Sequence, residues 1–464
     1  MKLVVIGGGI TGLAAAHRAV ELARERGAAL DLTLIEARER LGGTIASERV
    51  DGFLVEAGPD SFLSEKPWAL ALCRRLGVED RLVRTDDRFR KVFVWFGGQL
   101  HPLPDGFQLL APTAMRPFVT SSLFSLPGKL RMALDLVLPR GHADDESLGA
   151  FVRRRLGVEA LERVAQPLVA GIYTADPDDL SLAATMPRFL EVERRDRSII
   201  LGLRRALART PLPGTSGARW SLFVTFAGGM EELVSTLAAR LPPGAAVLKQ
   251  RVSALAREGE RWRVRTAEGG AFDAERVIVA TEAHATARLV RYLDPSLANL
   301  LGEIPYSSAA TISLGYRRAD VPHPLDGFGF VVPRSEGKAL LAGTFSSVKY
   351  PGRAPAGHVL LRCFLGGTLN AAVLSEDDGA LATRARAELR EALGITAEPV
   401  LTRLHRWPAS MPQYRVGHLA RAEAIEHAAA ALPGLALAGA AYRGVGIADC
   451  VRSGEAAAER VLQV

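Results

Sequence analysis

The first residues of this chain whose types and spacing could do chemistry are glycines. Gly7, Gly9 and Gly12 fit the pattern Gly-x-Gly-x-x-Gly, directly after the apolar residues 4–6. In such a pattern one glycine permits a tight turn, one lets backbone approach a pyrophosphate, and one lets a helix pack closely on a strand. The N–H groups at the start of that helix point toward the phosphates. The spacing therefore predicts a dinucleotide site.

An acidic residue ends the next apolar run and narrows the choice of ligand. Glu36 closes residues 30–37, LDLTLIEA, slightly beyond the offset of about 20 residues at which such a carboxylate binds a ribose hydroxyl. A carboxylate there repels a 2′-phosphate, which argues against NADP and leaves FAD and NAD. A strand-to-helix turn without any ligand is the competing interpretation. The ordered series of strand, glycines, helix, strand and acid argues against it.

Two other glycine-rich segments could bring backbone close to the same ligand. Gly42 and Gly43 form a doublet that a cofactor could approach without obstruction by side chains. Residues 441–450 read AYRGVGIADC, a glycine-rich loop that opens a helix. The N–H groups of such a helix start could stabilise negative charge on a bound cofactor. An ordinary helix cap, with Gly446 present only for its geometry, is the alternative.

The composition is that of a large globular enzyme. The chain has 464 residues, a hydrophobic content of 48% and a formal net charge of +7. The basic residues are spread along the chain, without a tract interleaved with aromatics. This distribution argues against nucleic-acid binding and leaves anionic small molecules or membrane surfaces as partners. Cys73, Cys363 and Cys450 are widely spaced, which argues against disulfides and against a metal site.

The distribution of apolar residues indicates where in the cell the protein is expected. No apolar run is long enough to cross a bilayer, and the first strand begins at residue 3, so we expect a cytoplasmic protein without a signal peptide. Residues 101–140 are strongly apolar but interrupted by prolines. They suit helices that lie at a membrane surface or line an apolar tunnel, although an ordinary helical core is equally compatible. The basic run 153–155 is interpreted as a solvated helix face.

The elements that must position these residues recur along the chain. Residues 220–290 predict a strand, a glycine pair and an amphipathic helix, followed by a β-meander that turns at residues 268–270. Residues 432–462 again predict a strand, a glycine-rich loop and a helix. The glycine motifs therefore lie at junctions between strands and helices, in widely separated parts of the chain.

Several motifs, in order, resemble the protoporphyrinogen and coproporphyrinogen oxidase family of the FAD-containing amine-oxidase superfamily. They are RLGG at 40–43, EAGP at 56–59, residues 151–187, GFGFVVP at 327–333, HRWPASMPQYRVGH at 405–418 and AYRGVGIADC at 441–450. The stretches at 58–63, 101–104 and 122–139 are most similar to the bacterial coproporphyrinogen III oxidases. Val92 departs from the arginine that mitochondrial and plastid members tend to carry at this place.

The resemblance implies an α/β and α+β fold with a discontinuous FAD-binding part. It implies a Rossmann-like FAD-binding domain of the amine-oxidase and p-hydroxybenzoate-hydroxylase type, a substrate-binding domain with a mixed sheet, and a mainly helical domain. We expect FAD-binding segments at 1–65, 220–290 and 410–464. The helical insertion that holds substrate and associates with the membrane is expected at 66–219, and the substrate-binding segment at 291–409.

The resemblance also implies which residues contact FAD and substrate. The expected FAD contacts are Gly7, Gly8, Gly9, Ile10, Thr11, Gly12, Glu36, Ala37, Gly43, Thr44, Gly58, Pro59, Asp60, Ser61, Val252, Trp407, Val445, Gly446 and Ile447. Lys66, Arg90 and Lys91 are candidate partners for substrate carboxylates, with ordinary surface positions as the alternative. No acid–base pair stands out, and His284, His405 and His418 are interpreted as structural.

The implied activity is oxygen-dependent, six-electron oxidation of coproporphyrinogen III to coproporphyrin III in haem biosynthesis. Hydride would pass to FAD three times, and dioxygen would carry the electrons away as hydrogen peroxide. The anionic porphyrinogen and dioxygen are then the partners, with weak contact to the inner face of the cell membrane. Protoporphyrinogen IX is the alternative substrate. A flavin oxidase or desaturase for amines or carotenoids, or a non-catalytic escort protein, would share the nucleotide motifs but not the later ones.

Overall fold

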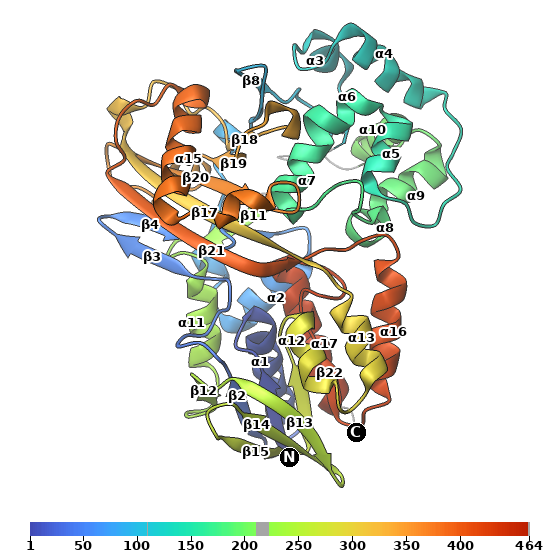
Figure 1. The fold of residues 1–464 in the computed structure, drawn as a ribbon, viewed down its shortest axis with the longest axis vertical. Helices are drawn as coiled ribbons and strands as arrows, with labels where there is room; N and C mark the ends of the chain where they lie inside the picture. The colour runs from blue at the N-terminus through green and yellow to red at the C-terminus, as the bar shows by residue number, and fades with distance from the viewer. Residues whose placement is uncertain (109, 210–221, 463–464) are drawn as a thin grey trace.

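The computed structural model describes residues 1–108, 110–209 and 222–462. One end of the molecule is built on a parallel sheet (Figure 1). Its five strands follow the order β12-β2-β1-β16-β22. They are β1 (Lys2–Ile6), β2 (Asp31–Ile35), β12 (Ala246–Val247), β16 (Arg276–Val279) and β22 (Leu435–Leu437). Three separated stretches of the chain therefore build one sheet. Parts of the predicted segments, at 109, 210–221 and 463–464, lie outside the described residues.

Apolar residues on both sides of β1 explain why this sheet is covered on both faces. Leu3 and Val5 point into one hydrophobic core, and Val4 and Ile6 point into another. The first core holds α1 (Ile10–Glu25), α2 (Pro67–Leu76), α11 (Glu231–Ala239) and α17 (Ile447–Leu462). The second holds α12 (Ala283–Val290), α13 (Pro295–Gly302) and α16 (His418–Ala430), with the meander β13 (Val252–Glu258), β14 (Arg261–Thr266) and β15 (Ala271–Ala274). Continuous apolar strands are typical of parallel sheets buried in this way.

A second, mixed sheet of seven strands lies above the parallel sheet (Figure 1). Its order is β21-β17-β20-β19-β18-β7-β8, and only β7 and β18 pair in parallel. The strands are β7 (Val92–Phe96), β8 (Gln99–Pro102), β17 (Tyr306–Arg317), β18 (Gly329–Val331), β19 (Leu340–Thr344), β20 (His358–Gly366) and β21 (Leu401–Pro412). Helix α15 (Asp378–Leu393) packs on one face through Leu381, Ala385 and Leu389.

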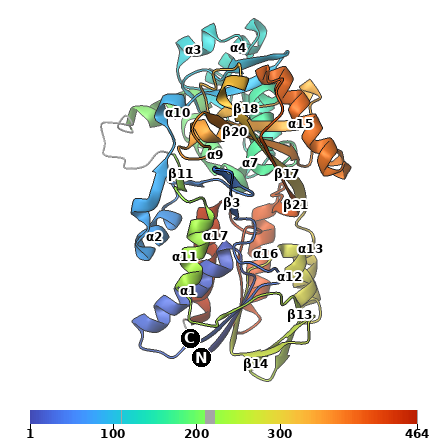
Figure 2. The same cartoon turned by 90° about the vertical axis from the view of Figure 1, so that its left-hand side faces the viewer.

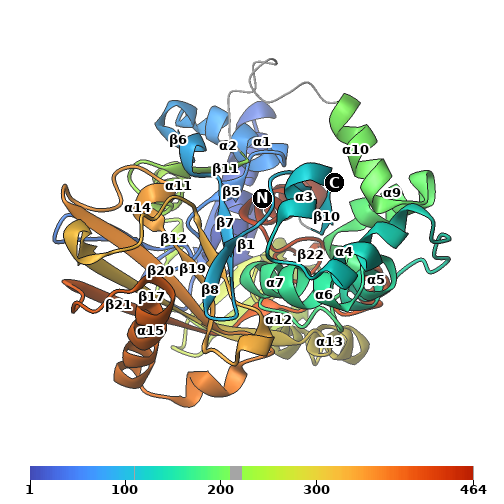
Figure 3. The same cartoon turned by 90° about the horizontal axis from the view of Figure 1, so that it is seen from above.

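A helical group stands beside the seven-stranded sheet, as Figures 2 and 3 show from the side and from above. It comprises α3 (Met115–Thr120), α4 (Leu126–Ala133), α5 (Leu148–Arg155), α6 (Val158–Ala160), α7 (Gln166–Tyr173), α8 (Leu182–Thr185), α9 (Pro187–Asp196) and α10 (Ile199–Arg209). Its core also takes up Val94, Val331 and Ala342 from the sheet. Among the described residues, no helix combines the length and the apolar character needed to span a bilayer. Parallel sheet, mixed sheet and helical group match the predicted fold class.

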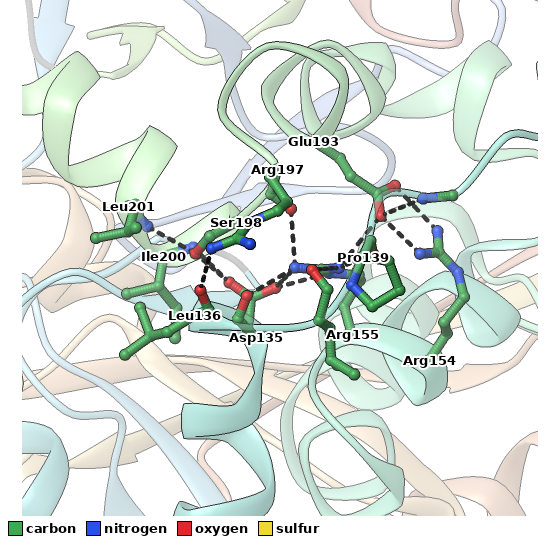
Figure 4. Close-up of polar contacts among 12 residues, drawn as sticks. Asp135, Leu136, Pro139, Arg154, Arg155, Glu193, Arg197, Ser198, Ile200 and Leu201 are labelled. Atoms are coloured by element: carbon green, nitrogen blue, oxygen red, sulfur yellow. Dashed lines mark hydrogen bonds and ion pairs between the residues drawn. The ribbon is translucent and has the colours of Figure 1, made fainter.

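The interpretation of residues 153–155 as a solvated face is wrong for Arg155. Its guanidinium is fully buried and lies 2.7 Å (Nε) from Asp135 Oδ1 (Figure 4). Ser198 Oγ donates to the other carboxylate oxygen at 2.6 Å. Arg155 also donates to the carbonyls of Pro139 and Arg197, at 2.7 and 2.9 Å. The pair ties α5 to the turn before α10. Only Arg153 of this run has an exposed side chain, because Arg154 is half-buried and pairs with Glu146 and Glu193.

Candidate functional site

The three motif glycines have distinct surroundings that match the predicted roles. Gly7 has φ of +105°, and a Cβ there would lie 2.7 Å from the Ala280 carbonyl oxygen. A Cβ on Gly12 would lie 1.9 Å from the Gly7 carbonyl oxygen, so this glycine permits close packing of α1 on β1. A Cβ on Gly9 would meet nothing nearer than the Gly43 Cα, at 4.0 Å. Backbone at Gly9 is therefore open to a ligand at the start of α1.

Glu36 is fixed at the end of β2, directly beside this turn. Its carboxylate accepts the Gly8 N–H at 2.7 Å and the Arg38 N–H at 2.8 Å, and the side chain is buried. A carboxylate has about four acceptor sites, so capacity for ribose hydroxyls remains. Ala37 follows in the chain, and Val252 begins β13 two residues after Gln250, whose N–H donates to the Glu36 carbonyl at 3.0 Å.

The second glycine segment lies against the first. The Gly42 N–H donates to the Gly8 carbonyl at 2.7 Å, and Gly43 faces Gly9. A Cβ on Gly58 would lie 1.8 Å from the Thr44 carbonyl oxygen, so Gly58 in turn packs on this segment. Residues 7–12, 36, 43–44 and 58 are thus brought together around one open stretch of backbone.

Residues 57–61 are held by the seven-stranded sheet. The Ala57 carbonyl accepts from Trp407 Nε1 at 2.8 Å, from Thr311 Oγ1 at 2.9 Å and from Arg362 Nη2 at 3.3 Å. Arg362 also donates to the Gly58 carbonyl. The indole N–H of Trp407, an expected FAD contact, is therefore used to fix this segment.

Asp60 carries the charge of the same segment. Its carboxylate lies 3.2 Å from Lys349 Nζ and accepts the Ser61 hydroxyl at 2.7 Å. Burial alone would raise the pKa of Asp60, but the charges of Lys349 and Arg362 outweigh it and hold this pKa well below its ordinary value. Asp60 is thus a carboxylate at neutral pH.

The C-terminal loop reaches the start of α1. Residues 445–447 lead into α17, which begins at Ile447. A Cβ on Gly454 would lie 2.2 Å from the Thr11 carbonyl oxygen, so α17 and α1 are in close contact. Burial raises the pKa of the Cys450 thiol, in the first turn of α17, to about 11, which keeps it neutral. The first turn of α17 therefore lies near the start of α1, and the first N–H groups of each helix have no partner within that helix.

Lys66 joins this region through an ion pair that the sequence did not reveal. Its Nζ lies 2.5 Å from Asp449 Oδ2 in the first turn of α17. The Asp449 side chain is only 5% exposed, whereas that of Lys66 is 41% exposed. An acidic residue in the first turn is favoured by the helix dipole. Lys66 can thus present its charge to a ligand while it stays anchored by Asp449.

The other two candidate cations lie elsewhere, at the start of β7. Lys91 is exposed and pairs with Asp326 at 2.8 Å. Arg90 precedes it and is also exposed. Val92, the predicted departure from the eukaryotic pattern, begins β7 and pairs with Gly329. Lys91 is thus already engaged at the surface by a carboxylate.

Lys349 and Arg362 are important contacts that the sequence analysis missed. Both reach residues 57–61 from nearly 300 positions away in the chain. Neither residue lies in a local motif, so the sequence carried no signal for them. Asp449, by contrast, lies within AYRGVGIADC and could have been singled out there.

These residues fit FAD. The open backbone between Gly9 and Gly43 provides a cradle without side chains for a pyrophosphate. Glu36 supplies acceptors for ribose hydroxyls, and the N–H groups at the starts of α1 and α17 supply donors. These hydrogen-bond donors thus suit an anionic dinucleotide whose ring system gains negative charge on reduction.

Comparisons with known proteins agree with this geometry. The model of the family described as flavin containing amine oxidoreductase matches residues 10–462. A Bacillus subtilis protein named coproporphyrinogen III oxidase is 37% identical, over 99% of this chain and 97% of its own length. A Bos taurus protein named protoporphyrinogen oxidase is 35% identical, over 99% of this chain and 98% of its own length.

Solved structures are similar over the same extent. A crystal structure of an Exiguobacterium protein, 32% identical, superposes with a TM-score of 0.87 over 100% of this chain and 99% of its own. The cyclohexylamine oxidase from Brevibacterium oxydans has a TM-score of 0.72 at 17% identity, over 100% of this chain and 98% of its own, and shares the fold.

Proposed function

Because the chain belongs to the family of flavin-containing amine oxidoreductases, with FAD as its cofactor, we propose that it oxidises coproporphyrinogen III to coproporphyrin III in haem biosynthesis. Relatives of that name, from Bacillus subtilis and from Staphylococcus aureus, are 37% and 31% identical over 99% of this chain. Oxidation of protoporphyrinogen IX is the second candidate, favoured by the 35% identity to the Bos taurus protein.

One observation carries the choice of substrate class: a partly exposed lysine stands at the first turn of α17, next to the C-terminal glycine-rich loop. Lys66 is anchored to Asp449 in the helix turn that follows residues 445–447. Coproporphyrinogen has four propionates, and protoporphyrinogen has two. A cation near the cofactor therefore favours the substrate with more carboxylates. Arg90 and Lys91 remain candidate partners for more distant propionates.

The reaction balances as three two-electron oxidations. Bound FAD would supply the two-electron acceptor for a hydride from a methylene bridge of the macrocycle, with dioxygen as the final acceptor of these electrons. Each round consumes one dioxygen and releases one hydrogen peroxide, while the pyrrole nitrogens and bridges lose the accompanying protons. Three rounds remove six electrons and six protons and leave the aromatic porphyrin. We assign no side chain as a general acid or base.

The chain's own residues position these reactants. We propose FAD contacts by residues 7–12, 36–37, 43–44, 58–61, 252, 407 and 445–447. Backbone N–H groups at the start of α17 would stabilise negative charge on the cofactor ring, because the N-terminus is the positive end of the helix dipole. The hydrogen bonds of Thr311 and Trp407 to the Ala57 carbonyl keep residues 58–61 in place.

We propose, in addition, weak contact with a membrane surface through α4 and the turn after it. Leu126, Leu130, Leu134 and Val137 are 70, 63, 48 and 65% exposed. Leu126 and Leu130, four residues apart, share one face of α4, and Leu134 and Val137 follow in the turn directly after it. Such an apolar stripe suits shallow, reversible insertion into a lipid surface. It lies in the predicted apolar tract, of which Leu109 is outside the described residues.

An assay of aerobic turnover tests the proposed reaction. Coproporphyrinogen III is supplied in air, and porphyrin fluorescence and hydrogen peroxide are followed together. We expect enzyme-dependent porphyrin formation with three hydrogen peroxide molecules for each porphyrin. A rate no greater than that of spontaneous oxidation would overturn the proposal.

A further inference from the structure

A buried tyrosine that is not among the expected FAD contacts holds the loop that precedes residues 445–447. The Gly444 N–H donates to the Tyr414 hydroxyl at 2.8 Å, and this hydroxyl donates in turn to the Ala440 carbonyl. Tyr414 is buried. One hydroxyl is therefore hydrogen-bonded to the backbone at both ends of residues 440–444.

His418 supports the same loop from the same direction. Its ring stacks on that of Tyr414, with centroids 3.8 Å apart and planes 12° from parallel. Its Nε2 lies 2.8 Å from the Tyr442 carbonyl oxygen. Burial lowers the pKa of His418, so the ring is neutral at pH 7, and Nε2 must carry the proton to donate this bond.

The loop itself can adopt this path only with glycine at two points. Gly439 has φ of +134° and Gly444 has φ of +140°. A Cβ on Gly444 would lie 2.4 Å from Asp449 Cγ, so the loop packs against the carboxylate that anchors Lys66. The Gly439 N–H donates to Ser453 Oγ at 3.0 Å. The loop is thus held by its contacts with α17 and, in addition, by Tyr414 and His418.

Tyr414 and His418 follow β21, the strand that supplies Trp407 to the Ala57 carbonyl. One stretch of chain, residues 407–418, therefore contacts both the 57–61 segment and the 440–444 loop. Since residues 58–61 and 445–447 are both proposed to contact the cofactor, this stretch couples their positions.

We propose that Tyr414, supported by His418, is a positioning residue for the cofactor: its hydroxyl aims the N–H groups of residues 445–447 at the flavin ring. This inference rests on the proposed flavin contacts at 445–447. Without the hydroxyl, the donors would be free to move away from the charge that develops on reduction. Reduced flavin would then lose stabilisation, while the glycine cradle and Glu36 would still hold the cofactor.

The test compares Tyr414→Phe holoenzyme with wild type. The substitution keeps the ring stack and removes one oxygen. We expect full FAD occupancy, a midpoint potential shifted to more negative values and an altered flavin absorbance band. A tenfold loss of preference for reduced flavin corresponds to about 30 mV for a two-electron couple. We expect kcat to fall about threefold to tenfold with little change in KM, the size expected for one hydrogen bond.

Tyr316→Phe is the matched control, because Tyr316 is a buried tyrosine of β17 in the core between the mixed sheet and α15. Its potential and kcat should equal those of wild type. If Tyr414→Phe does not yield holoenzyme, His418→Phe keeps a stacked ring and removes only the bond to the Tyr442 carbonyl. We expect a shift in the same direction for it.

Two outcomes would overturn the inference. Wild-type potential, absorbance and kcat in Tyr414→Phe would do so, whether or not the melting temperature falls, because a merely structural role changes stability alone. Gly446→Val separates this failure from failure of the proposed contacts. A shifted potential in Gly446→Val without one in Tyr414→Phe rejects only the role of Tyr414. An unchanged potential in Gly446→Val rejects the contacts at 445–447 and the inference together.

Discussion

At the scale of single residues, Gly9 is the position at which a side chain would most directly oppose the cofactor. A Cβ there points into open space toward Gly43, without a clash inside the protein. A side chain at Gly9 should therefore affect cofactor binding without affecting folding. Gly7 and Gly12 do not allow this separation, because a Cβ at either one would meet backbone within 2.7 Å.

We predict that Gly9→Val yields folded protein with little bound FAD, because the side chain fills the space that a pyrophosphate must enter. The ratio of flavin to protein absorbance after purification measures occupancy. Gly302→Val, at a glycine of α13 with open surroundings, is the matched control and should stay fully loaded. Full occupancy in Gly9→Val would show that FAD does not approach this turn.

Lys66 is the residue through which the substrate proposal is tested. We predict that Lys66→Ala weakens apparent affinity for coproporphyrinogen III several-fold, because a partly exposed ion pair contributes about 0.2–1 kcal/mol. The effect on protoporphyrinogen IX should be smaller. Lys2→Ala serves for comparison, since Lys2, at the start of β1, is an exposed lysine that pairs with the exposed carboxylate of Asp31 and has no place in the proposed site. Steady-state kinetics with both substrates give the ratios, and an unchanged ratio in Lys66→Ala would remove Lys66 from the substrate site.

At the scale of elements, the buried pair of Asp135 and Arg155 fixes the helical group. Both side chains are fully buried, and the carboxylate also accepts from Ser198 Oγ and from the Ile200 N–H. Through the bonds of Asp135 to Ser198 and Ile200, the pair connects α5 with the start of α10 (Figure 4). Removing one partner would leave a buried charge without compensation.

We predict that Asp135→Ala lowers the free energy of unfolding by about 3–5 kcal/mol, the range for breaking a buried ion pair. Asp178→Ala is the control, because it removes the exposed partner of Arg153 at 2.9 Å, and should cost less than about 1 kcal/mol. Denaturant unfolding followed by fluorescence measures both. Equal small losses in the two variants would mean that Arg155 finds other partners.

Local patterns predicted the elements around the cofactor well, and long-range contacts were not predictable. The spacing of Gly7, Gly9 and Gly12 placed β1, α1 and their turn, because each glycine answers a local steric need. The roles of Arg362 and Tyr414 depend on strands that meet only in the folded chain. The error at Arg155 has the same origin, since its partner Asp135 lies on another element.

At the scale of the whole molecule, the apolar stripe and the dinucleotide sheet lie at opposite ends. Helix α4 is at the top of Figure 1, and β15 and the chain termini are at the bottom. A membrane contact through α4 would therefore leave the parallel sheet directed away from the lipid. The mixed sheet and the rest of the helical group lie between the two (Figure 1).

We predict that the protein binds vesicles containing anionic lipid weakly and reversibly, and that Leu130→Glu reduces this binding, because a charge is placed in the exposed stripe. Val400→Glu, which alters an apolar residue of comparable exposure just before β21, should bind as wild type does. Vesicle sedimentation measures the bound fraction. Binding that resists high salt and alkaline washing would contradict a shallow, reversible contact.

The substrate preference of the wild-type enzyme tests the central claim most directly. The measurement is kcat/KM for coproporphyrinogen III and for protoporphyrinogen IX, with FAD-loaded protein, in air, under one detergent and one salt concentration. The account predicts the higher value for coproporphyrinogen III, because its additional propionates can meet the Lys66 cation beside the cofactor segments. A clearly higher value for protoporphyrinogen IX would contradict it.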